Sequence, residues 1–319
     1  MSEQGKTGSV TARQGHLVRM TVAGGQLRAA ACITTPVIEE ARRRHHLWPT
    51  AAAALGRLMT ASVLLASSLK DDERIMLQII GDGPLRHLVA EATARLEVRG
   101  YAANPHVHLP LNDRHKLDVA GAVGKGDLYV MRDLGLKEPY RGAVPLASGE
   151  IAEDVAYYLA YSEQTPASVA LGVLVSEDGS IRAAGGWLVT PLPGAPSELV
   201  EEVARRLRQA PAVSRTIDEL GQGASARGLI EGLLGDLDVR VLATAPVAFR
   251  CPCTRQRMDA GLVALGAQEL RDLASEQDPV ELRCRFCNRR YLFSAKRLRQ
   301  LADRAERPAL RAVKNDRSP

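Results

Sequence analysis

Four of the five cysteines stand in two close pairs, and their thiol chemistry is the most specific signal in the sequence. Cys251 and Cys253 form a C-x-C pair in FRCPCTRQRM, and Cys284 and Cys287 form a C-x-x-C pair in LRCRFCNRRY. Two thiol pairs joined by a connector of thirty residues are typical of a tetrahedral Zn²⁺ site. We therefore expect these four cysteines to bind one Zn²⁺ ion, although four thiolates also suit an iron–sulfur cluster.

Four thiolate ligands complete the coordination sphere of zinc and leave no position at which a water molecule could be activated. We therefore do not expect a hydrolytic zinc enzyme. The sequence motifs of nucleotide-driven and serine-hydrolase chemistry are absent as well, so an enzyme of those classes is not indicated either. The net negative charge of such a site would be offset by arginines that flank the cysteines, namely Arg250, Arg255, Arg257, Arg283, Arg285, Arg289 and Arg290.

Paired thiols would also allow a redox switch, because an oxidant that converts each pair to a disulfide removes all four ligands from the metal. A structural zinc contributes on the order of 10–16 kcal/mol to the folding of a small module. A disulfide within such a pair closes a tiny loop, which is worth only about 1.5–2 kcal/mol. Oxidation would then remove most of the stability of the module. The residues themselves permit this switch, and they equally permit a zinc ion that is only structural.

The composition is that of a folded protein, since 25 % of the 319 residues are charged and 45 % are hydrophobic. This length suggests about two domains. The N-terminal residues contain no apolar stretch typical of a signal peptide, and the most apolar segment, residues 51–69, contains an arginine and several hydroxyl side chains. We therefore expect a soluble, cytoplasmic protein with no membrane partner.

The net charge of +5 is concentrated at the C-terminal end. Residues 285–319 contain eleven Lys and Arg against three Asp and Glu, whereas the other 284 residues sum to −3. A basic end of this kind could contact nucleic acid. Because the arginines beside the cysteines serve partly as counter-charge, we do not expect a nucleic-acid partner, and a nucleic-acid-binding zinc module is kept as the alternative hypothesis.

The patterns of residues 13–193 mix helices and antiparallel strands, which predicts an α+β core domain. Apolar alternation and turn residues predict strands within 16–35, on both sides of a turn at 23–26, and at 74–80, 85–91, 96–102, 127–132, 167–176 and 181–190. Helical patterns cover 37–46, 50–69 and 149–161.

After the core, the sequence predicts a helical linker over residues 194–246. Its first helix, SELVEEVARRLRQA, is amphipathic, but the part that follows is interrupted by Gly221, Gly223, Gly228, Gly232 and Gly235. Each glycine inside a helix costs about 1 kcal/mol relative to alanine, so this segment is marginal unless it packs on something. Taken alone, the pattern favours helices held by packing over a segment that is meant to melt. A small zinc-binding domain over 247–300 and a basic tail over 301–319 complete the predicted organisation.

Several blocks along the chain, together with the cysteine spacing, resemble the redox-regulated heat-shock chaperone family known as the 33 kDa chaperonin. The resemblance covers about residues 13–295. It rests on AAAALGRLMTASVLLASSLK, LQIIGDGPL, RGYAANP, GEIAEDVAYYLAYSEQTP, AAGGWLVTPLPGA, FRCPC and CRFCNRRYLF.

This resemblance implies an ATP-independent holdase, which is not an enzyme, that protects unfolding client proteins under oxidative stress. It implies that Cys251, Cys253, Cys284 and Cys287 bind zinc when reduced, and that oxidation forms the disulfides Cys251–Cys253 and Cys284–Cys287 with loss of the metal. The linker would then unfold, which reverses the interpretation of the glycine-rich segment as a static helix pair. Unfolded clients are the implied partners, and the oxidised protein is expected to be a homodimer.

Three further residues carry weaker signals. Cys32 has no partner by spacing, and we expect it to be a buried apolar residue rather than a reactive thiol. His106 and His108 would share one face of a strand, but the sequence places no acidic or cysteine ligand near them, so a second metal site is not expected.

Overall fold

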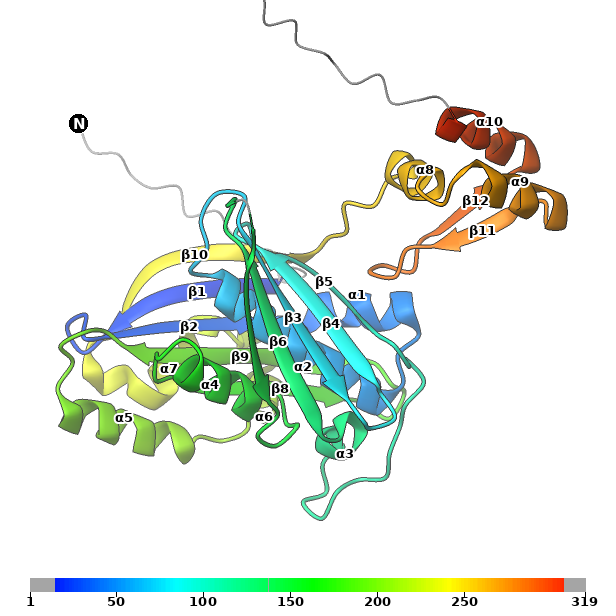
Figure 1. Cartoon of the computed structure of the whole chain (residues 1–319). Coiled ribbons are helices and arrows are strands. Elements are labelled where there is room, and N and C mark those ends of the chain that lie inside the picture. The colour runs from blue at the N-terminus through cyan, green and yellow to red at the C-terminus, as the bar shows by residue number, and fades with distance from the viewer. Residues whose placement is uncertain (1–14, 137, 307–319) are drawn as a thin grey trace, which may run out of the picture. The chain divides into compact units, whose positions relative to one another are not determined.

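The computed structural model describes residues 15–136 and 138–306 (Figure 1). These residues divide into two compact units, one that ends at Cys251 and one that begins at Pro252. Helices and mostly antiparallel strands are mixed in both units. The predicted α+β class is therefore confirmed.

The first unit is built on one ten-stranded sheet with the order β7-β6-β3-β4-β5-β10-β1-β2-β9-β8. Its pairs are antiparallel except for β10 with β5, which is parallel. The strands are β1 (Gly15–Val22), β2 (Leu27–Ile33), β3 (Arg74–Gly81), β4 (His87–Thr93), β5 (Glu97–Ala102), β6 (Gly126–Asp133), β7 (Tyr140–Pro145), β8 (Ser168–Val175), β9 (Ile181–Pro191) and β10 (Arg240–Phe249).

Helix α2 (Pro49–Ala66) lies in the centre of the main core. Pro49 starts the helix at a position where its missing N–H is no loss, and sixteen of the eighteen residues are buried. The helix is long and apolar enough to cross a membrane, but 89 % of it is buried inside the unit, as expected for a core helix. The other helices around this core are α1 (Thr35–His45), α3 (Val119–Val123) and α4 (Ala152–Tyr161).

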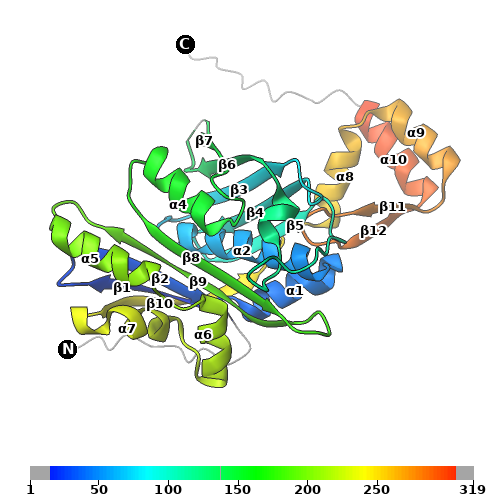
Figure 2. The ribbon, with the colours of Figure 1, turned by 90° about the horizontal axis from the view of Figure 1, so that it is seen from below.

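A second apolar core lies on the other face of β1, β2 and β9, where three short helices cover the sheet (Figure 2). The sheet contributes Val18, Met20, Trp187 and their neighbours, all less than a tenth exposed. The covering elements are α5 (Ser197–Arg208), α6 (Val213–Leu220), η1 (Gly221–Gly223), α7 (Ala226–Leu234) and η2 (Gly235–Leu237). The predicted linker is therefore helical and packed on the sheet.

The second unit is small and has its own core around Leu270, Phe293 and Leu298, each essentially inaccessible. Its strands pair antiparallel as a hairpin. Its elements are α8 (Arg255–Val263), α9 (Ala267–Glu276), β11 (Val280–Arg283), β12 (Arg290–Phe293) and α10 (Ala295–Glu306).

The structure differs from the sequence-based organisation at three places. Strands β7 and β10 were not predicted, and residues 240–246, assigned to the linker, belong to β10 within the sheet. The predicted boundary at 246/247 therefore falls inside a strand, and the two compact units divide at 251/252. Helix α10 continues across the predicted end of the zinc domain at residue 300, and the rest of the expected basic tail, 307–319, lies outside the described residues.

Candidate metal centre

The first cysteine pair follows directly on strand β10. The N–H of Arg250 donates to the carbonyl of Val98 at 3.0 Å, so the sheet pairing between β10 and β5 extends to the residue before Cys251. On the other side of the pair, the Thr254 hydroxyl accepts from the N–H of Arg257 and caps the start of α8. The C-x-C segment is thus held between the end of a strand and the start of a helix.

The second cysteine pair lies in the loop of the β11–β12 hairpin. The N–H of Cys284 donates to the carbonyl of Arg289 at 3.0 Å, and the Cys284 carbonyl accepts from Cys287 at 3.3 Å and from Asn288 at 2.8 Å. Asn288 has a φ of 55°, a left-handed conformation that asparagine tolerates better than most residues. This tight turn brings both sulfurs of the pair to one side of the loop.

The sulfurs of Cys251, Cys253, Cys284 and Cys287 all lie within 4.8 Å of one another. A tetrahedral zinc with Zn–S bonds of about 2.3 Å requires sulfurs about 3.8 Å apart. The sulfurs of Cys253 and Cys287 lie 3.3 Å apart, which is too long for a disulfide. Three of the four are buried and Cys251 is half-buried. Donor chemistry, separation and burial all fit one Zn²⁺ ion, which would draw the sulfurs to equal distances.

A buried ion pair contacts the first ligand. Arg99 on β5 donates from Nη1 to the Cys251 sulfur at 3.5 Å, and its Nη2 lies 2.8 Å from Glu91 Oε1 on β4. The side chains of Arg99 and Glu91 are only 15 % and 9 % exposed. Burial acts to lower the pKa of Arg99, but the hydrogen bond to Cys251 and the charges of Glu91 and Cys251 outweigh it and raise that pKa. The guanidinium therefore stays charged beside the sulfur and would stabilise its thiolate form.

Tyr291 on β12 contacts a second ligand, since its hydroxyl donates to the Cys253 sulfur at 3.2 Å. This hydrogen bond is the main reason that the pKa of Tyr291 is raised. Groups of this kind around a metal site orient the ligands and tune their basicity. Sequence reasoning missed both Arg99 and Tyr291: Arg99 lies 152 residues from Cys251, and neither residue belongs to a ligand motif.

Cys32 is buried as the sequence predicted, and His106 and His108 lie in a segment that is not a strand. Cys32 is fully buried on β2, and burial raises the pKa of its thiol, so it behaves as an apolar core residue. His108 bonds the Thr50 hydroxyl through Nδ1 at 3.2 Å, and the centroids of the His106 and Trp48 rings lie 5.6 Å apart with the rings tilted by 44°. In the described part of the chain, the four-cysteine cluster is the only group of three or more such side chains that could hold a metal.

Comparison with known proteins decides the family. The family model described as Hsp33 protein matches residues 15–294. The chain belongs to the Hsp33 family. It is 47 % identical to the 33 kDa chaperonin of Geobacillus kaustophilus over 92 % of this chain and 99 % of that protein, and 43 % identical to the one of Bacillus subtilis over the same shares. The crystal structure of the 33 kDa chaperonin from Thermotoga maritima superposes with a TM-score of 0.83 at 39 % identity, covering 91 % of this chain and 98 % of that one.

Membership in the Hsp33 family confirms the resemblance found in the sequence, and it identifies the chain as a heat-shock chaperone rather than a member of an enzyme family. All four cysteines of the cluster fall inside the residues that the family model matches. The candidate metal centre therefore lies in the C-terminal part of the region that the family model covers.

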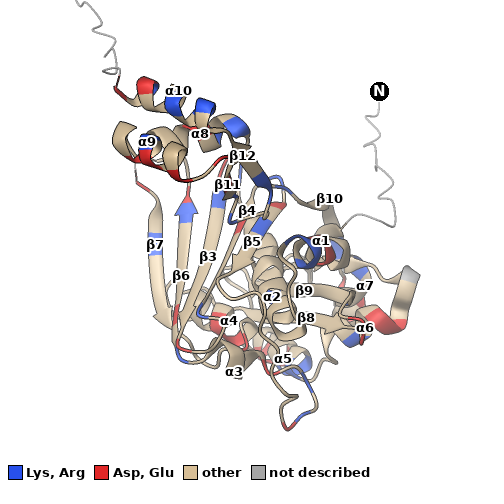
Figure 3. Cartoon of the chain, turned by 90° about the vertical axis from the view of Figure 1, so that its right-hand side faces the viewer, with Lys and Arg blue, Asp and Glu red and all other residues tan. Residues whose placement is uncertain are grey.

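The basic end of the chain is partly neutralised in the structure. Figure 3 shows both signs of charge on α10. Four of the eleven basic residues of 285–319 lie beyond residue 306, outside the described range. Among the described basic residues of this end, Arg290 pairs with Glu281 and Arg297 pairs with Asp259. This pairing engages two of the basic side chains that a nucleic-acid-binding module would use to contact phosphates.

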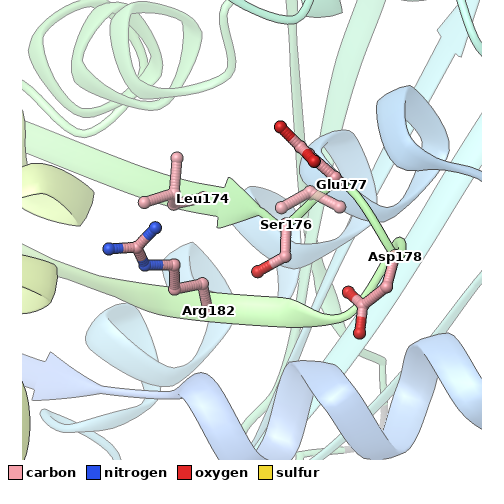
Figure 4. Close-up of a pocket in the computed structure, with 6 residues that line it drawn as sticks. Leu174, Ser176, Glu177, Asp178 and Arg182 are labelled. Carbon is pink, nitrogen blue, oxygen red and sulfur yellow. The ribbon is translucent and has the colours of Figure 1, made fainter.

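A surface hollow of about 440 Å³ lies at the β8–β9 hairpin, away from the cysteines in the sequence (Figure 4). It is lined by Leu174, Val175, Ser176, Glu177, Asp178 and Arg182. Arg182 pairs with Asp218 on α6 at 2.5 Å, and the hydroxyl and N–H of Ser180 donate to Asp178 and lower its pKa. These bonds engage Asp178 within the hairpin and Arg182 in its contact with α6.

Proposed function

We propose that this Hsp33 protein is a redox-regulated, ATP-independent holdase of the cytoplasm. In the reduced state, Cys251, Cys253, Cys284 and Cys287 would bind one Zn²⁺ ion, which supplies the stability of the small second unit. Under oxidative stress the disulfides Cys251–Cys253 and Cys284–Cys287 would form and the metal would leave. The helices over the second core would then detach, and the exposed sheet face would bind unfolding clients, with the oxidised protein forming a homodimer.

The oxidation step is a two-electron reaction at each pair. Two thiolates, one hydrogen peroxide molecule and two protons give one disulfide and two water molecules. The first thiolate attacks the peroxide and becomes a sulfenic acid, and its neighbour then displaces the hydroxyl group to form the S–S bond. The short spacing within each pair places the second thiol where it can trap the first before further oxidation.

The observation that carries the proposal is the apolar sheet face beneath α5, α6 and α7. Val18, Met20, Leu27, Trp187 and Val189 are each 4 % exposed or less with the helices in place. Without the helices they would form a contiguous apolar surface, which is what binding of unfolded chains requires. Among the covering elements, α7 contains Gly228 and Gly232, and the short turns η1 and η2 contain the other three glycines, so this part of the covering layer has a low intrinsic helix propensity.

The ion pairs of the covering helices are weak. Arg206 pairs with Asp236 within the segment, and Arg182 on β9 pairs with Asp218 on α6, but at least one partner in each pair is more than half exposed. Exposed ion pairs contribute about 0–1 kcal/mol. Ion pairs therefore contribute little to holding these helices, and apolar burial on the sheet is the main contribution.

The chain path links the cysteines to this segment. Helix α7 is followed by η2, which ends at Leu237, and strand β10 then runs without interruption to Phe249, two residues before Cys251. A zinc ion on Cys251 would anchor the far end of β10. Release of the metal would free that end, and the loss of order could then pass along the strand toward α7.

The test follows zinc and clients together. Reduced, zinc-loaded protein is exposed to hydrogen peroxide at mildly raised temperature while a chromogenic chelator reports free zinc. The aggregation of an unfolding client is recorded in parallel by light scattering, and mass spectrometry maps the disulfides. We expect zinc to leave first, both C-x-C and C-x-x-C peptides to lose two hydrogens, and client aggregation to be suppressed only afterwards. Dithiothreitol with zinc should reverse all three changes.

A matched pair of variants separates the switch cysteines from thiols in general. Cys284→Ser should weaken zinc binding, whereas Cys32→Ser should leave the zinc content and the response to peroxide unchanged. Retention of zinc under peroxide, or its loss without any protection of clients, would contradict the proposal. Salt-sensitive RNA or DNA binding by the reduced protein would instead support the nucleic-acid alternative.

A further inference from the structure

A histidine on the sheet holds the start of helix α7. His16 lies on the same face of β1 as Val18 and Met20, two β1 residues that the helices cover. Its Nε2 accepts a hydrogen bond at 3.1 Å from the N–H of Ala226, the first residue of α7. Ala226 is fully buried, and His16 is half-buried. This bond joins the sheet directly to the covering helix across 210 residues of sequence.

The bond requires a neutral imidazole. Because Nε2 accepts, the ring carries its single proton on Nδ1. A second proton on Nε2 would turn the acceptor into a donor that faces the N–H of Ala226. It would also place a positive charge at the N-terminus of α7, where the helix dipole is itself positive. Protonation therefore replaces one attraction by two repulsions at the same point.

Among the described residues, no charged group is a cause of the lowered pKa of His16. Burial is the cause of this lowered pKa. Charged side chains on the elements that contact β1 form ion pairs with one another: Arg227 with Glu231 on α7, Arg240 with Asp238 at β10, and Glu39 with Arg42 and Glu40 with Arg43 and Arg44 on α1. On β1 itself, Arg19 donates to the carbonyl of Ser67. Arg28 on β2 is exposed.

We infer that His16 is an acid sensor, and that its protonation releases α7 from the sheet and opens the apolar face without an oxidant and while zinc is still bound. Acidification would then be a second trigger of the chaperone, separate from the cysteines. The inference rests on the proposed function in one respect, namely that the opened face binds clients.

The direction of the pH effect follows from linkage. The free imidazole of an opened linker has an ordinary pKa of about 6.5, and the closed form binds the proton more weakly. Above about pH 6.5 both forms are neutral and the closed state keeps its full stability. Below it, the open form takes up the proton first, so the ratio of open to closed molecules rises up to tenfold for each pH unit until the closed form also titrates.

Trp187 offers a direct readout of opening, because it lies under the covering helices and is 3 % exposed. Trp48, the other tryptophan, is about half exposed and its ring contacts that of His106, so the experiment uses the Trp48→Phe background. Reduced, zinc-loaded protein is brought from pH 7.5 to 5.5, and the tryptophan emission and the zinc that remains bound after desalting are measured at each pH.

The matched variants are His16→Gln, which keeps an acceptor at the Nε2 position but does not titrate, and His106→Gln at an exposed histidine. We expect a red shift of Trp187 emission below about pH 6.5 in the parent and in His106→Gln, with zinc retained, and no shift in His16→Gln. An unchanged emission in the parent, an equal shift in His16→Gln, or zinc loss that precedes the shift would overturn the inference.

Two further measurements keep the outcome clear if a variant folds poorly. In the unmodified protein, the ¹⁵N resonance of His16 Nε2 must titrate below 6.5 together with the Ala226 amide, and a value at or above 6.5 would overturn the inference. Client aggregation at pH 5.5 tests the shared assumption. Opening through His16 that leaves clients unprotected would refute the client-binding role of the sheet face, whereas peroxide activation of His16→Gln tests the redox switch by itself.

Discussion

Replacing Gly232 with alanine should hold helix α7 closed. Gly232 lies inside α7, on the edge of a cavity of about 120 Å³ that Trp187, Val213 and Leu229 also line. A Cβ atom built at this position meets nothing within 4 Å, so alanine fits without any rearrangement. The residue is exposed, and we therefore count only the helix-propensity gain, which is about 1 kcal/mol. This gain should lower the open fraction of the linker about fivefold.

The assay is hydrogen exchange of the α7 amides in reduced, zinc-loaded protein, combined with the peroxide dose that gives half-maximal protection of a client. Exchange of α7 should slow about fivefold, and the peroxide response should be delayed. Gly261→Ala in α8 is the matched control, because its Cβ also meets nothing within 4 Å but it lies outside the covering helices.

A second contrast comes from Gly228, one turn earlier in α7. Alanine there would place its Cβ 3.0 Å from the Ser225 hydroxyl, which accepts the N–H of Gly228 and caps the helix. Crowding of the cap should cancel the propensity gain. The reasoning is refuted if Gly232→Ala leaves α7 exchange unchanged, or if Gly261→Ala slows it to the same extent.

Three other changes have defined outcomes. Arg99→Met should lower the free energy of unfolding by about 3–5 kcal/mol in urea titrations, because it leaves Glu91 buried without its partner; the double variant with Glu91→Gln should recover part of the loss, and a loss under 1 kcal/mol would show that the pair is dispensable. Chelation of zinc under reducing conditions should unfold residues 252–306 without peroxide, seen as fast hydrogen exchange confined to that unit at first; unchanged exchange would contradict a structural metal. After chelation and without denaturant, maleimide should modify the four clustered cysteines and spare Cys32, which should react only once denaturant is added. Early labelling of Cys32 would disprove its burial.

The sequence predicts well those parts of the fold whose signals are local. The hairpin of β1 and β2 follows from alternation on both sides of a turn at residues 23–26, and the cluster of four cysteines was expected from the spacing within each cysteine pair. In both cases the residues that carry the signal are also those that form the contact.

Strand β10 shows why other parts could not be predicted. Its residues are mostly exposed or half-buried, it contains Pro246, and its partners β1 and β5 lie more than 140 residues earlier in the chain. No local pattern records such a pairing, because the strand is specified by hydrogen bonds to distant edges. The same limit applies to Arg99 and His16, whose partners Cys251 and Ala226 are 152 and 210 residues away.

The position of β10 also governs the order in which the molecule can be completed during synthesis. The strand is inserted between β5 and β1, so it joins the two halves of the sheet, although it is the last strand of the first unit to be made (Figure 1). A nascent chain that stops before residue 240 has two unpaired sheet edges, at β1 and at β5, and such edges recruit other strands. Until its last sheet strand emerges, this chaperone is itself an aggregation-prone chain, and any truncated form that omits the cysteines must keep the residues up to Arg250 to avoid that state.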